Sequence, residues 1–384
     1  MQPSPSGTSV SDPELARRLF EHGATFVLLD LPPGSQFGLD LAAWTTDHSF
    51  KGIKMIPPGL HFIHCSAVSK QGQVAPRIGL FYHFAAKEVL VRKWDPQTED
   101  MVAVDRETSD SISSNLLDLD RHLGPYPYDG LRHWFSLTNF ISPPDLLRLC
   151  PLDSGGRITS QADLSCAEEL SSEHRESYHR VDRAHPTRAR IRDGDGLPIM
   201  QISSRTRIRF SQLPDRRASL RGQTSARDRT DHGMDCFALI DSLVAGMGDR
   251  AECILAELQF SFICFLHCQL WEAWEQWRAL VQMLCGSLRA VASRPGLYSD
   301  LLYVLYYQIK HMPEEVLQEV GASNGDNFLQ HSLSQLFLAI QDLSPQLPSD
   351  LQKRARDFRA FLERKFKWDL AEENEEDKPQ IVIT

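Results

Sequence analysis

Short apolar runs separated by turn residues characterise the chain from Ala24 to about Val104. ATFVLLDL is followed by the turn PPGS, and GIKMIPPGLHFIHCSAV has the pattern of two strands around a Pro-Pro-Gly turn. RIGLFYHF and EVLVRKWD flank the short connection Ala85–Lys87. This spacing is typical of an antiparallel sandwich or barrel rather than of βαβ units. We therefore predict a β-rich, antiparallel, sandwich-like N-terminal domain with flanking helices over residues 12–152.

Helical periodicity dominates residues 231–370. The apolar stretch from Ala251 to Leu288 must hold two helices, which we expect to join near His267–Gln269. The last segment presents one apolar face at Leu351, Ala355, Phe358, Leu362 and Phe366. Short polar connections between such segments predict an all-α domain, either a bundle or a right-angled stack. The predicted fold class is α+β, with the β-rich domain first and the helical domain second.

Residues 153–230 lack this periodicity. Between Arg175 and Arg229 there are fourteen arginines, no lysine and six acidic residues, an excess of eight positive charges. This composition predicts an Arg-rich flexible linker. Within it, Thr206–Pro214 alternates apolar and charged residues like a strand. We also predict that residues 1–11 are disordered.

Composition and charge narrow the class of protein. The chain has 384 residues, 42% hydrophobic and 24% charged, as expected of two soluble globular domains. Its net charge of −10 argues against a protein that coats nucleic acid with its whole surface. We find neither a secretory signal nor an apolar run of about 20 residues that could span a membrane. Eight scattered cysteines then suggest reduced thiols in an intracellular protein.

Motifs for metal or cofactor binding are weak. The pentapeptides HFIHC (His61–Cys65) and CFLHC (Cys264–Cys268) contain zinc-binding residue types. Strand alternation, however, places His61 and His64 on opposite faces, and we expect CFLHC in the middle of a helix. DGDG at Asp193–Gly196 lacks the glutamate that ends a calcium loop. Phosphate-binding loops and nucleophile elbows are also missing from the sequence. We therefore predict no metal, no cofactor, no small-molecule substrate and no enzymatic activity.

Two features could serve a partner or its regulation. Trp271, Trp274 and Trp277 form a helical series too wide for one narrow stripe, so at least one ring should face away from its own core. The series either packs between domains or provides aromatic anchors, Trp271 and Trp274, for a partner protein. In the linker, RRAS at Arg216–Ser219 resembles a basophilic kinase site, and phosphorylation of Ser219 would add negative charge among arginines.

The C-terminal tail, residues 371–384, combines an acidic run with a β-branched end. Glu372–Asp377 contains five acidic residues in six positions, and Pro379 favours an extended backbone before it. The last five residues either fray or add as a strand to the sheet edge of another protein. The residues of this predicted partner-binding strand are Gln380, Ile381, Val382, Ile383 and Thr384.

Six segments in order carry a family resemblance: PELARRLFEHGA, FKGIKMIPPGLHFIHCSAV, LGPYPY with SLTNFIS, RIRFSQLP, AELQFSFICFL with WEAWEQW, and KFKWDL. Together they resemble the AAR-two (a1-alpha2 repression) splicing-factor family, assembly factors of the U5 small nuclear ribonucleoprotein (snRNP). The resemblance implies a VHS-like helical domain and a function without catalysis, in the cytoplasm and nucleus. Family members hold the U5 scaffold protein through its RNase H-like and Jab/MPN domains, and they delay docking of the U5 RNA helicase. The resemblance also implies indirect association with U5 snRNA, release linked to phosphorylation, and a C-terminal strand that bridges the two scaffold domains.

Three functions follow as hypotheses. The first is an assembly chaperone for the U5 scaffold protein. The second is an RNA-binding protein that acts through the Arg-rich linker, although Tyr178 and Phe210 are its only aromatic residues for base stacking. The third is a trafficking-type adaptor, suggested only by the VHS-like analogy.

Overall fold

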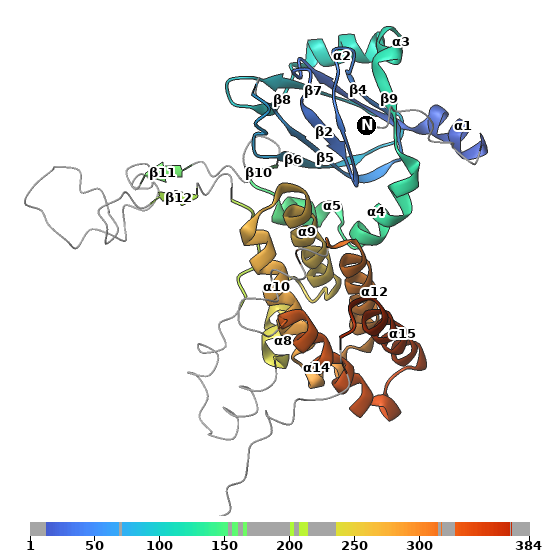
Figure 1. Cartoon of the computed structure of the whole chain (residues 1–384), viewed down its shortest axis with the longest axis vertical. Coiled ribbons are helices and arrows are strands. Elements are labelled where there is room, and N and C mark those ends of the chain that lie inside the picture. The colour runs from blue at the N-terminus through green and yellow to red at the C-terminus, as the bar shows by residue number, and fades with distance from the viewer. Residues whose placement is uncertain are drawn as a thin grey trace, which may run out of the picture. The chain divides into compact units, whose positions relative to one another are not determined.

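The computed structural model describes residues 13–68, 71–152, 156–159, 164–166, 200–202, 207–213, 236–313, 316, 327–368 and 370. The chain divides into two compact units, shown in Figure 1. The first comprises residues 1–130, 146–209 and 267–269, and the second comprises residues 131–145, 210–266 and 270–384. The predicted order of a β-rich domain followed by a helical domain is confirmed. The N-terminus, residues 1–11, lies outside the described residues.

Two five-stranded sheets form the first unit (Figure 1). The first sheet has the order β8 (Asp100–Ala103), β7 (Val89–Asp95), β1 (Ala24–Leu29), β4 (Gly52–Ile56), β9 (Leu123–Pro125). The second has the order β10 (Arg157–Thr159), β6 (Ile78–Phe84), β5 (Gly59–Ser66), β2 (Gln36–Leu39), β3 (Ala42–Thr45). A separate two-stranded sheet pairs β11 (Leu164–Cys166) with β12 (Met200–Ile202).

Pairing in the first sheet is mixed, which differs from the purely antiparallel prediction. β1 pairs with β7 and β4 pairs with β9 in parallel, whereas the second sheet is antiparallel throughout. Parallel neighbours need long connections, because a tight hairpin can only reverse the chain. Strand patterns identify the strands but do not reveal which distant ones pair.

Strand β1 is buried on both faces, which explains why its sequence ATFVLL does not alternate between apolar and polar residues. On one side, the ring of Phe26 stacks on Phe37 of β2 at 5.9 Å between ring centres, joining the two sheets. On the other side, Val27 packs with Val91 and Leu123 beneath α2 and α3. A strand covered on both faces has apolar residues at consecutive positions. The helices and 3₁₀ turns of this region are α1 (Pro13–His22), α2 (Arg106–Ser114), α3 (Leu116–Leu119), η1 (Asp120–His122), η2 (Tyr128–Gly130) and α5 (Pro143–Leu149).

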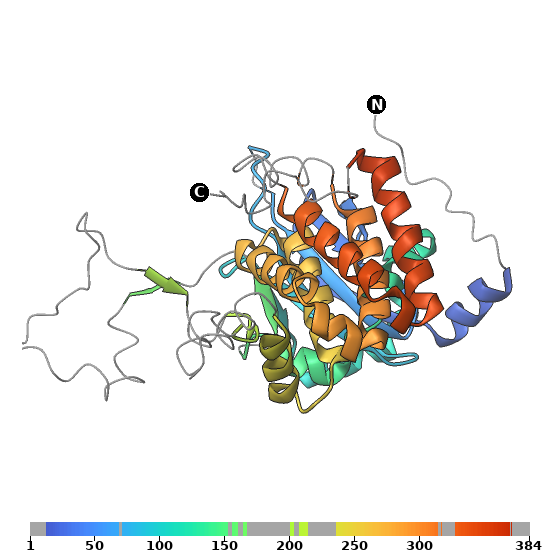
Figure 2. The same ribbon diagram turned by 90° about the horizontal axis from the view of Figure 1, so that it is seen from below.

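The second unit is helical, and Figure 2 shows its helices packed side by side. Its elements are α4 (Leu131–Thr138), α8 (Phe237–Gly246), α9 (Glu252–Cys268), α10 (Trp271–Cys285), α11 (Leu288–Ser293), α12 (Pro295–His311), α14 (Phe328–Asp342), η4 (Ser344–Gln346) and α15 (Ser349–Phe366). The predicted junction between α9 and α10 is confirmed, and Gln269 turns the chain there with a φ of 56°. Of the predicted apolar face of α15, Leu351, Ala355, Phe358 and Leu362 are buried. In the described part of the chain, no helix is both long and apolar enough to cross a bilayer.

Helix α9 is the central helix of the second unit. Every residue from Cys253 to Cys264 is buried, so this stretch has no exposed face. A helix that is buried all round must be surrounded by others. Phe262 packs on Trp277 of α10, and the carbonyl of Leu258 accepts a hydrogen bond from Gln308 of α12.

The segment predicted as a strand at Thr206–Pro214 is not one. Its described part, residues 207–213, forms no regular element and pairs with no described strand. Side chains hold it instead: Arg209 donates to the carbonyl of Cys150 at 2.9 Å, and Ser211 donates to Glu257. The alternation of Ile208 and Phe210 therefore reflects two separate packing sites, since Ile208 is buried in the first unit and Phe210 packs on Phe260 in the second.

Candidate protein-interaction site

Trp271 is the exposed member of the tryptophan series. It is 63% exposed at the first position of α10, whereas Trp274 and Trp277 are 1% and 0% exposed. The rings of Trp274 and Trp277 lie 5.1 Å apart and both contact the edge of Phe328. The assignment of Trp274 as a partner-facing anchor is therefore corrected, because its ring is covered by its own unit. Trp271 is the residue of this series that a partner can reach.

Buried polar groups hold the helices beneath Trp271. The indole N–H of Trp277 donates to Gln308 Oε1 at 2.8 Å, and Gln308 Nε2 donates to the carbonyl of Leu258 at 3.1 Å. These bonds tie α10 to α12 and α12 to α9. Trp271 thus extends from a helix that buried hydrogen bonds tie to the core of its unit.

Glu257 is a buried polar residue of α9. Its carboxylate accepts hydrogen bonds from the backbone N–H and hydroxyl of Ser211, each at 2.7 Å, and from Gln276 at 2.9 Å. Gln259 lies two residues further along α9, where it accepts a hydrogen bond from the N–H of Phe140 and donates one to the side chain of Asn139. Sequence analysis missed these roles. The available signal was a polar residue inside an otherwise apolar helix.

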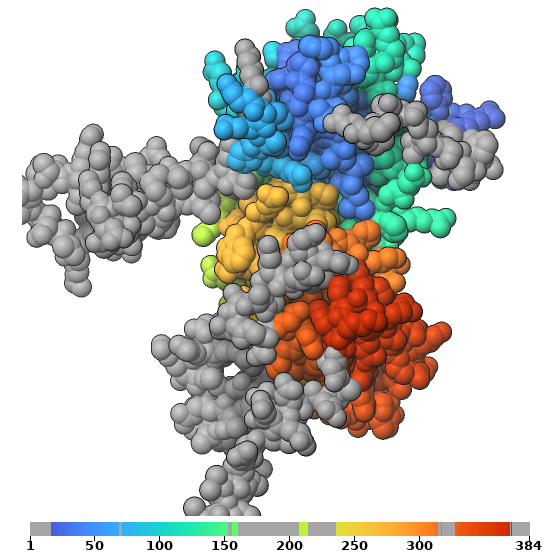
Figure 3. Space-filling model, viewed as in Figure 1, coloured from blue at the N-terminus to red at the C-terminus, as the bar shows by residue number. Residues whose placement is uncertain are grey.

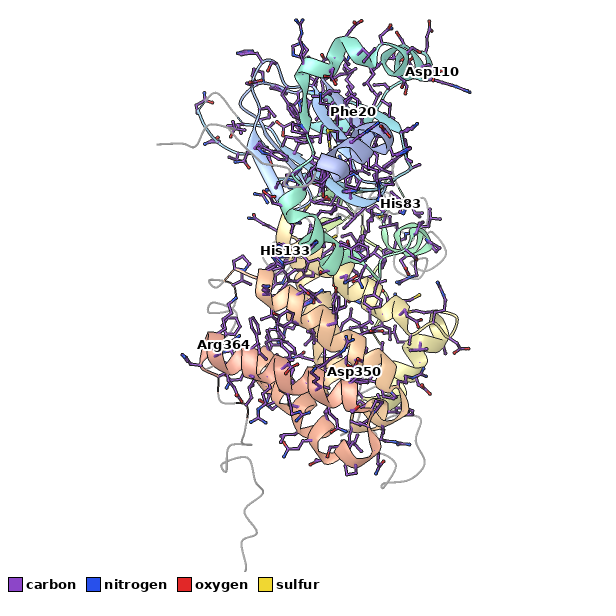
Figure 4. The ribbon with its side chains drawn as sticks, turned by 90° about the vertical axis from the view of Figure 1, so that its right-hand side faces the viewer. Phe20, His83, Asp110, His133, Asp350 and Arg364 are labelled. Carbon is purple, nitrogen blue, oxygen red and sulfur yellow. The ribbon has the colours of Figure 1, made fainter. Side chains whose placement is uncertain are left out.

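A groove of about 380 Å³ lies between α14 and α15. Phe337, Ile340 and Ala355 form its buried apolar floor, and Arg356 and Arg359 stand at its rim. Helix α15 forms much of the visible surface of this unit in Figure 3, and Figure 4 marks Asp350 and Arg364 near its two ends. An apolar floor beside guanidinium groups can bind carboxylates next to apolar side chains. No sequence pattern identified this groove, because two helices build it together.

Asp40, His61 and Tyr126 form a buried network in the first unit. Asp40 Oδ2 lies 2.6 Å from His61 Nδ1 and accepts a hydrogen bond from the Tyr126 hydroxyl at 2.5 Å. Its second oxygen accepts the N–H of Phe62 at 2.9 Å, and His61 Nε2 lies 2.8 Å from the carbonyl of Pro57. Both ring nitrogens of His61 thus lie within hydrogen-bond distance of acceptor oxygens, which fixes the orientation of the ring. The network joins the FGLD, PPGLH and PYPY segments and organises the fold.

The two pentapeptides considered for zinc do meet, through His64 and His267. CFLHC lies at the end of α9 rather than in the middle of a helix, and the two imidazole rings are 5.3 Å apart. Both rings also pack on Phe62. His61 points to the other face of β5, where it meets Asp40. In the described ranges, no group of three or more His, Cys, Asp or Glu side chains has an arrangement suited to a metal ion.

Burial keeps these two histidines neutral. Burial, the neighbouring His267 and Arg77 hold the pKa of His64 well below its usual 6.5. Burial and Arg77 lower the pKa of His267 to about 4. Space is tight as well, because a Cβ on Gly38 would lie 2.1 Å from the His64 ring. A neutral, closely packed pair is a structural element of the first unit.

Acidification should therefore destabilise the first unit. Above pH 6.5 both histidines are neutral in the folded and unfolded chain, so they add no pH dependence. Below pH 6.5 both histidines of the unfolded chain bind protons, whereas His267 of the folded chain accepts one only near pH 4. The expected loss between these values is about 3 kcal/mol from His267, at about 1.4 kcal/mol per pH unit. Urea unfolding gives the unfolding free energy of wild type and of His267→Phe at several pH values in this range. The loss due to His267 is the difference between the two slopes of unfolding free energy against pH.

His83 supplies the control for this titration. Its side chain is exposed at the surface of the first unit, as Figure 4 shows. His83→Phe should leave the pH dependence of wild type unchanged, while His267→Phe should flatten it. If the unfolding free energy of wild type and of His267→Phe had the same slope against pH, His267 would not be a source of the pH dependence.

The remaining predicted site residues cannot be placed. The strand residues Gln380–Thr384 and the phosphorylation site Ser219 lie outside the described residues. Their roles stay predictions.

Both parts of the chain match family models. Residues 22–151 match the AAR2 N-terminal domain, and residues 210–371 match the AAR2 C-terminal repeat region. The protein named Protein AAR2 homolog in Caenorhabditis elegans is 36% identical over 368 residues, covering 93% of this chain and 98% of that protein. The human protein of the same name is 36% identical over 379 residues, covering 97% and 96%, and the mouse protein is 36% identical over 381 residues with the same coverage.

Proposed function

Because the chain belongs to the AAR2 family, we propose that it is a non-catalytic assembly factor of the U5 snRNP. It binds the RNase H-like and Jab/MPN domains of the U5 scaffold protein and delays docking of the helicase during spliceosome maturation. In this role it associates with U5 snRNA only indirectly and works in the cytoplasm and nucleus. Phosphorylation of Ser219 would add negative charge that pairs with neighbouring arginines and reorganises the linker.

The observation that carries this proposal is the extent of the family match. It covers both structural units and nearly the whole chain, and family membership supports involvement in the splicing machinery. The surface chemistry agrees with a protein partner. Trp271 is a large, exposed aromatic residue on α10, a residue type enriched among binding hot spots. The β-branched end of the tail suits addition to a sheet edge.

RNA binding through the linker is the second candidate, favoured by the excess of eight positive charges between Arg175 and Arg229. It predicts an affinity for RNA that falls steeply with salt. Titration of fluorescent single-stranded RNA at two salt concentrations separates the candidates. Scaffold binding that is unaffected when RNA is removed by nuclease favours the assembly factor.

The C-terminal strand provides the direct test. Ile381→Asp, or deletion of Gln380–Thr384, should weaken binding to the scaffold fragments about tenfold or more, because a charged side chain cannot occupy a buried strand position. Calorimetric titration with the RNase H-like and Jab/MPN fragments measures the affinity. Thermal unfolding should stay cooperative, which shows that both variants are folded. Unaltered binding by the truncated chain would show that the tail is a frayed end without a role in binding. If the wild-type chain bound neither fragment, the proposed function would be wrong.

Trp271→Ala should weaken scaffold binding without loss of stability. A truncated hot-spot residue costs about 2 kcal/mol or more of binding free energy, or roughly thirtyfold in affinity. The unfolding free energy should change by less than about 0.5 kcal/mol, as is usual for surface substitutions. Leu288→Ala is a matched control, because Leu288 is also an exposed apolar residue of this unit, 45% exposed. Equal affinities of wild type and Trp271→Ala would exclude Trp271 from the interface.

A further inference from the structure

The groove between α14 and α15 has the chemistry of a peptide-binding site. Its floor of Phe337, Ile340 and Ala355 is apolar, and its volume of about 380 Å³ accommodates a few side chains. Arg356 and Arg359 lie three residues apart on one face of α15, so both can reach a ligand in the groove. A suitable ligand carries several carboxylates followed by apolar side chains.

The C-terminal tail of the same chain has this composition. The helix α15 contains six basic and three acidic residues, an excess of three positive charges. The tail, residues 371–384, contains five acidic residues and one lysine, an excess of four negative charges before its terminal carboxylate. Its apolar triplet, Ile381–Ile383, follows the acidic run. Complementary charge brings the two segments together and fixes their register.

The tail begins close enough to reach the groove. Lys367 ends α15 in the left-handed conformation with a φ of 59°, which turns the chain away from the helix axis, and Leu370 is buried. Arg359 and Ala355 lie about 11 and 17 Å back along the helix from its end at Phe366, at 1.5 Å per residue. An extended chain spans about 3.3 Å per residue. Ile381 is fifteen residues beyond Phe366, which is up to about 50 Å of extended chain. Both the acidic run and Ile381–Ile383 can therefore reach the groove.

We propose that residues 371–384 dock in this groove of their own chain when no partner is bound. Carboxylates of Glu372–Asp377 pair with Arg356 and Arg359, and Ile381–Ile383 cover the apolar floor. The tail then has two alternative sites, its own groove and the sheet edge of the scaffold protein, so its release from the groove precedes scaffold capture. This second step rests on the proposed function, whereas the docking itself does not.

Glu363 shares Arg359 with the docked tail. Its carboxylate lies 2.7 Å from Arg359 Nε, and both side chains are partly exposed. A guanidinium group has five N–H donors, so Arg359 can bind Glu363 and one tail carboxylate together. Charge pairs at such an exposed rim are weak and sensitive to salt. Weak pairing suits a segment that a partner must displace.

Methyl NMR of the full chain tests the docking. The methyl resonances of Ile340 and Ala355 are compared between wild type and the tail variant Ile381→Ser/Val382→Ser/Ile383→Ser. We expect these resonances to differ, and high salt should move wild type toward the variant. The methyl of Ile254, buried in α9, should not change. Identical groove resonances in wild type and the tail variant would overturn the proposal.

Charge reversals in the same helix identify the contact. In the background Arg356→Glu/Arg359→Glu, the tail variant should cause no further change at Ile340 and Ala355. In the control background Lys353→Glu/Arg364→Glu, the same charge is reversed at two exposed positions that do not line the groove, and the tail effect should persist. A tail effect that is equal in both backgrounds would place the tail elsewhere.

The scaffold fragments distinguish this inference from the proposed function. On binding, they should shift the groove methyls of wild type to the positions of the tail variant. If the tail is docked in about nine chains of ten, Arg356→Glu/Arg359→Glu should tighten scaffold binding about tenfold. Groove methyls that respond to the tail without any scaffold binding would refute the function alone. Scaffold binding without a tail effect on the groove would refute the docking alone.

Discussion

Asp40→Asn should lower the unfolding free energy of the first unit by about 3 kcal/mol, as expected when a buried network loses an acceptor oxygen and its donors are left unpaired. The Asp40 carboxylate accepts three hydrogen bonds, from His61, Tyr126 and the N–H of Phe62. An amide has one acceptor oxygen and would direct its own N–H groups at one of these donors. Denaturant unfolding measures the loss.

Asp30→Asn is a close control for this substitution. Both aspartates have a positive φ, 59° at Asp30 and 54° at Asp40, a conformation that asparagine tolerates. Asp30 is exposed and faces Lys93 at 3.4 Å, so its replacement should cost less than about 0.5 kcal/mol. Tyr126→Phe, which removes one of the three donors, should cost about 1 kcal/mol. Similar losses for Asp40→Asn and Asp30→Asn would show that burial of the network contributes nothing.

Glu257→Ala should destabilise the second unit by about 3 kcal/mol, because it leaves a buried cavity and removes the acceptor of three hydrogen bonds. Ser211 loses both its side-chain and its backbone bond, and Gln276 loses a third. The residues around Ser211 should then detach from α9, and amide exchange at Ser211 should accelerate in parallel with the loss of stability. Unfolding and hydrogen exchange are the two measurements.

Glu275→Ala provides the comparison on the neighbouring helix. Glu275 is exposed on α10, and alanine is favourable in a helix, so the unfolding free energy should change by less than about 0.5 kcal/mol. Amide exchange at Ser211 should stay at the wild-type rate. Fast exchange in the Glu275 variant, or slow exchange in the Glu257 variant, would contradict the role given to Glu257.

Periodicity predicted the elements of the fold well where packing is simple. The junction near His267–Gln269 and the buried residues of α15 followed from helical spacing, because each helix buries one predictable face. The prediction of a strand at Thr206–Pro214 was wrong. Hydrogen bonds made by Arg209 and Ser211, and not pairing in a sheet, hold this segment. Of the candidate site, Trp271 was identified from its spacing, but the same spacing could not show that Trp274 is covered by Phe328 and Phe265.

The domain boundaries show a similar limit. The predicted linker began at residue 153, yet β10 at Arg157–Thr159 completes the second sheet by pairing with β6. Conversely, α4 belongs to the helical unit, where it packs on α12. A short element contributes too few apolar residues to indicate its own neighbours, so its membership depends on contacts distant in sequence.

The sequence by itself determined the class of fold, the order of the two domains, the separation of α9 from α10 and the family resemblance. These depend on local spacing and on ordered segments, which are properties of neighbouring residues. Only the tertiary structure decided that HFIHC and CFLHC meet through His64 and His267, that Asp40 lies against His61 and Tyr126, and that α14 and α15 enclose a groove beside Arg356. Each of these pairs residues far apart in the chain or on different helices, and their side chains become neighbours only when the core excludes water and each buried polar group takes an available partner.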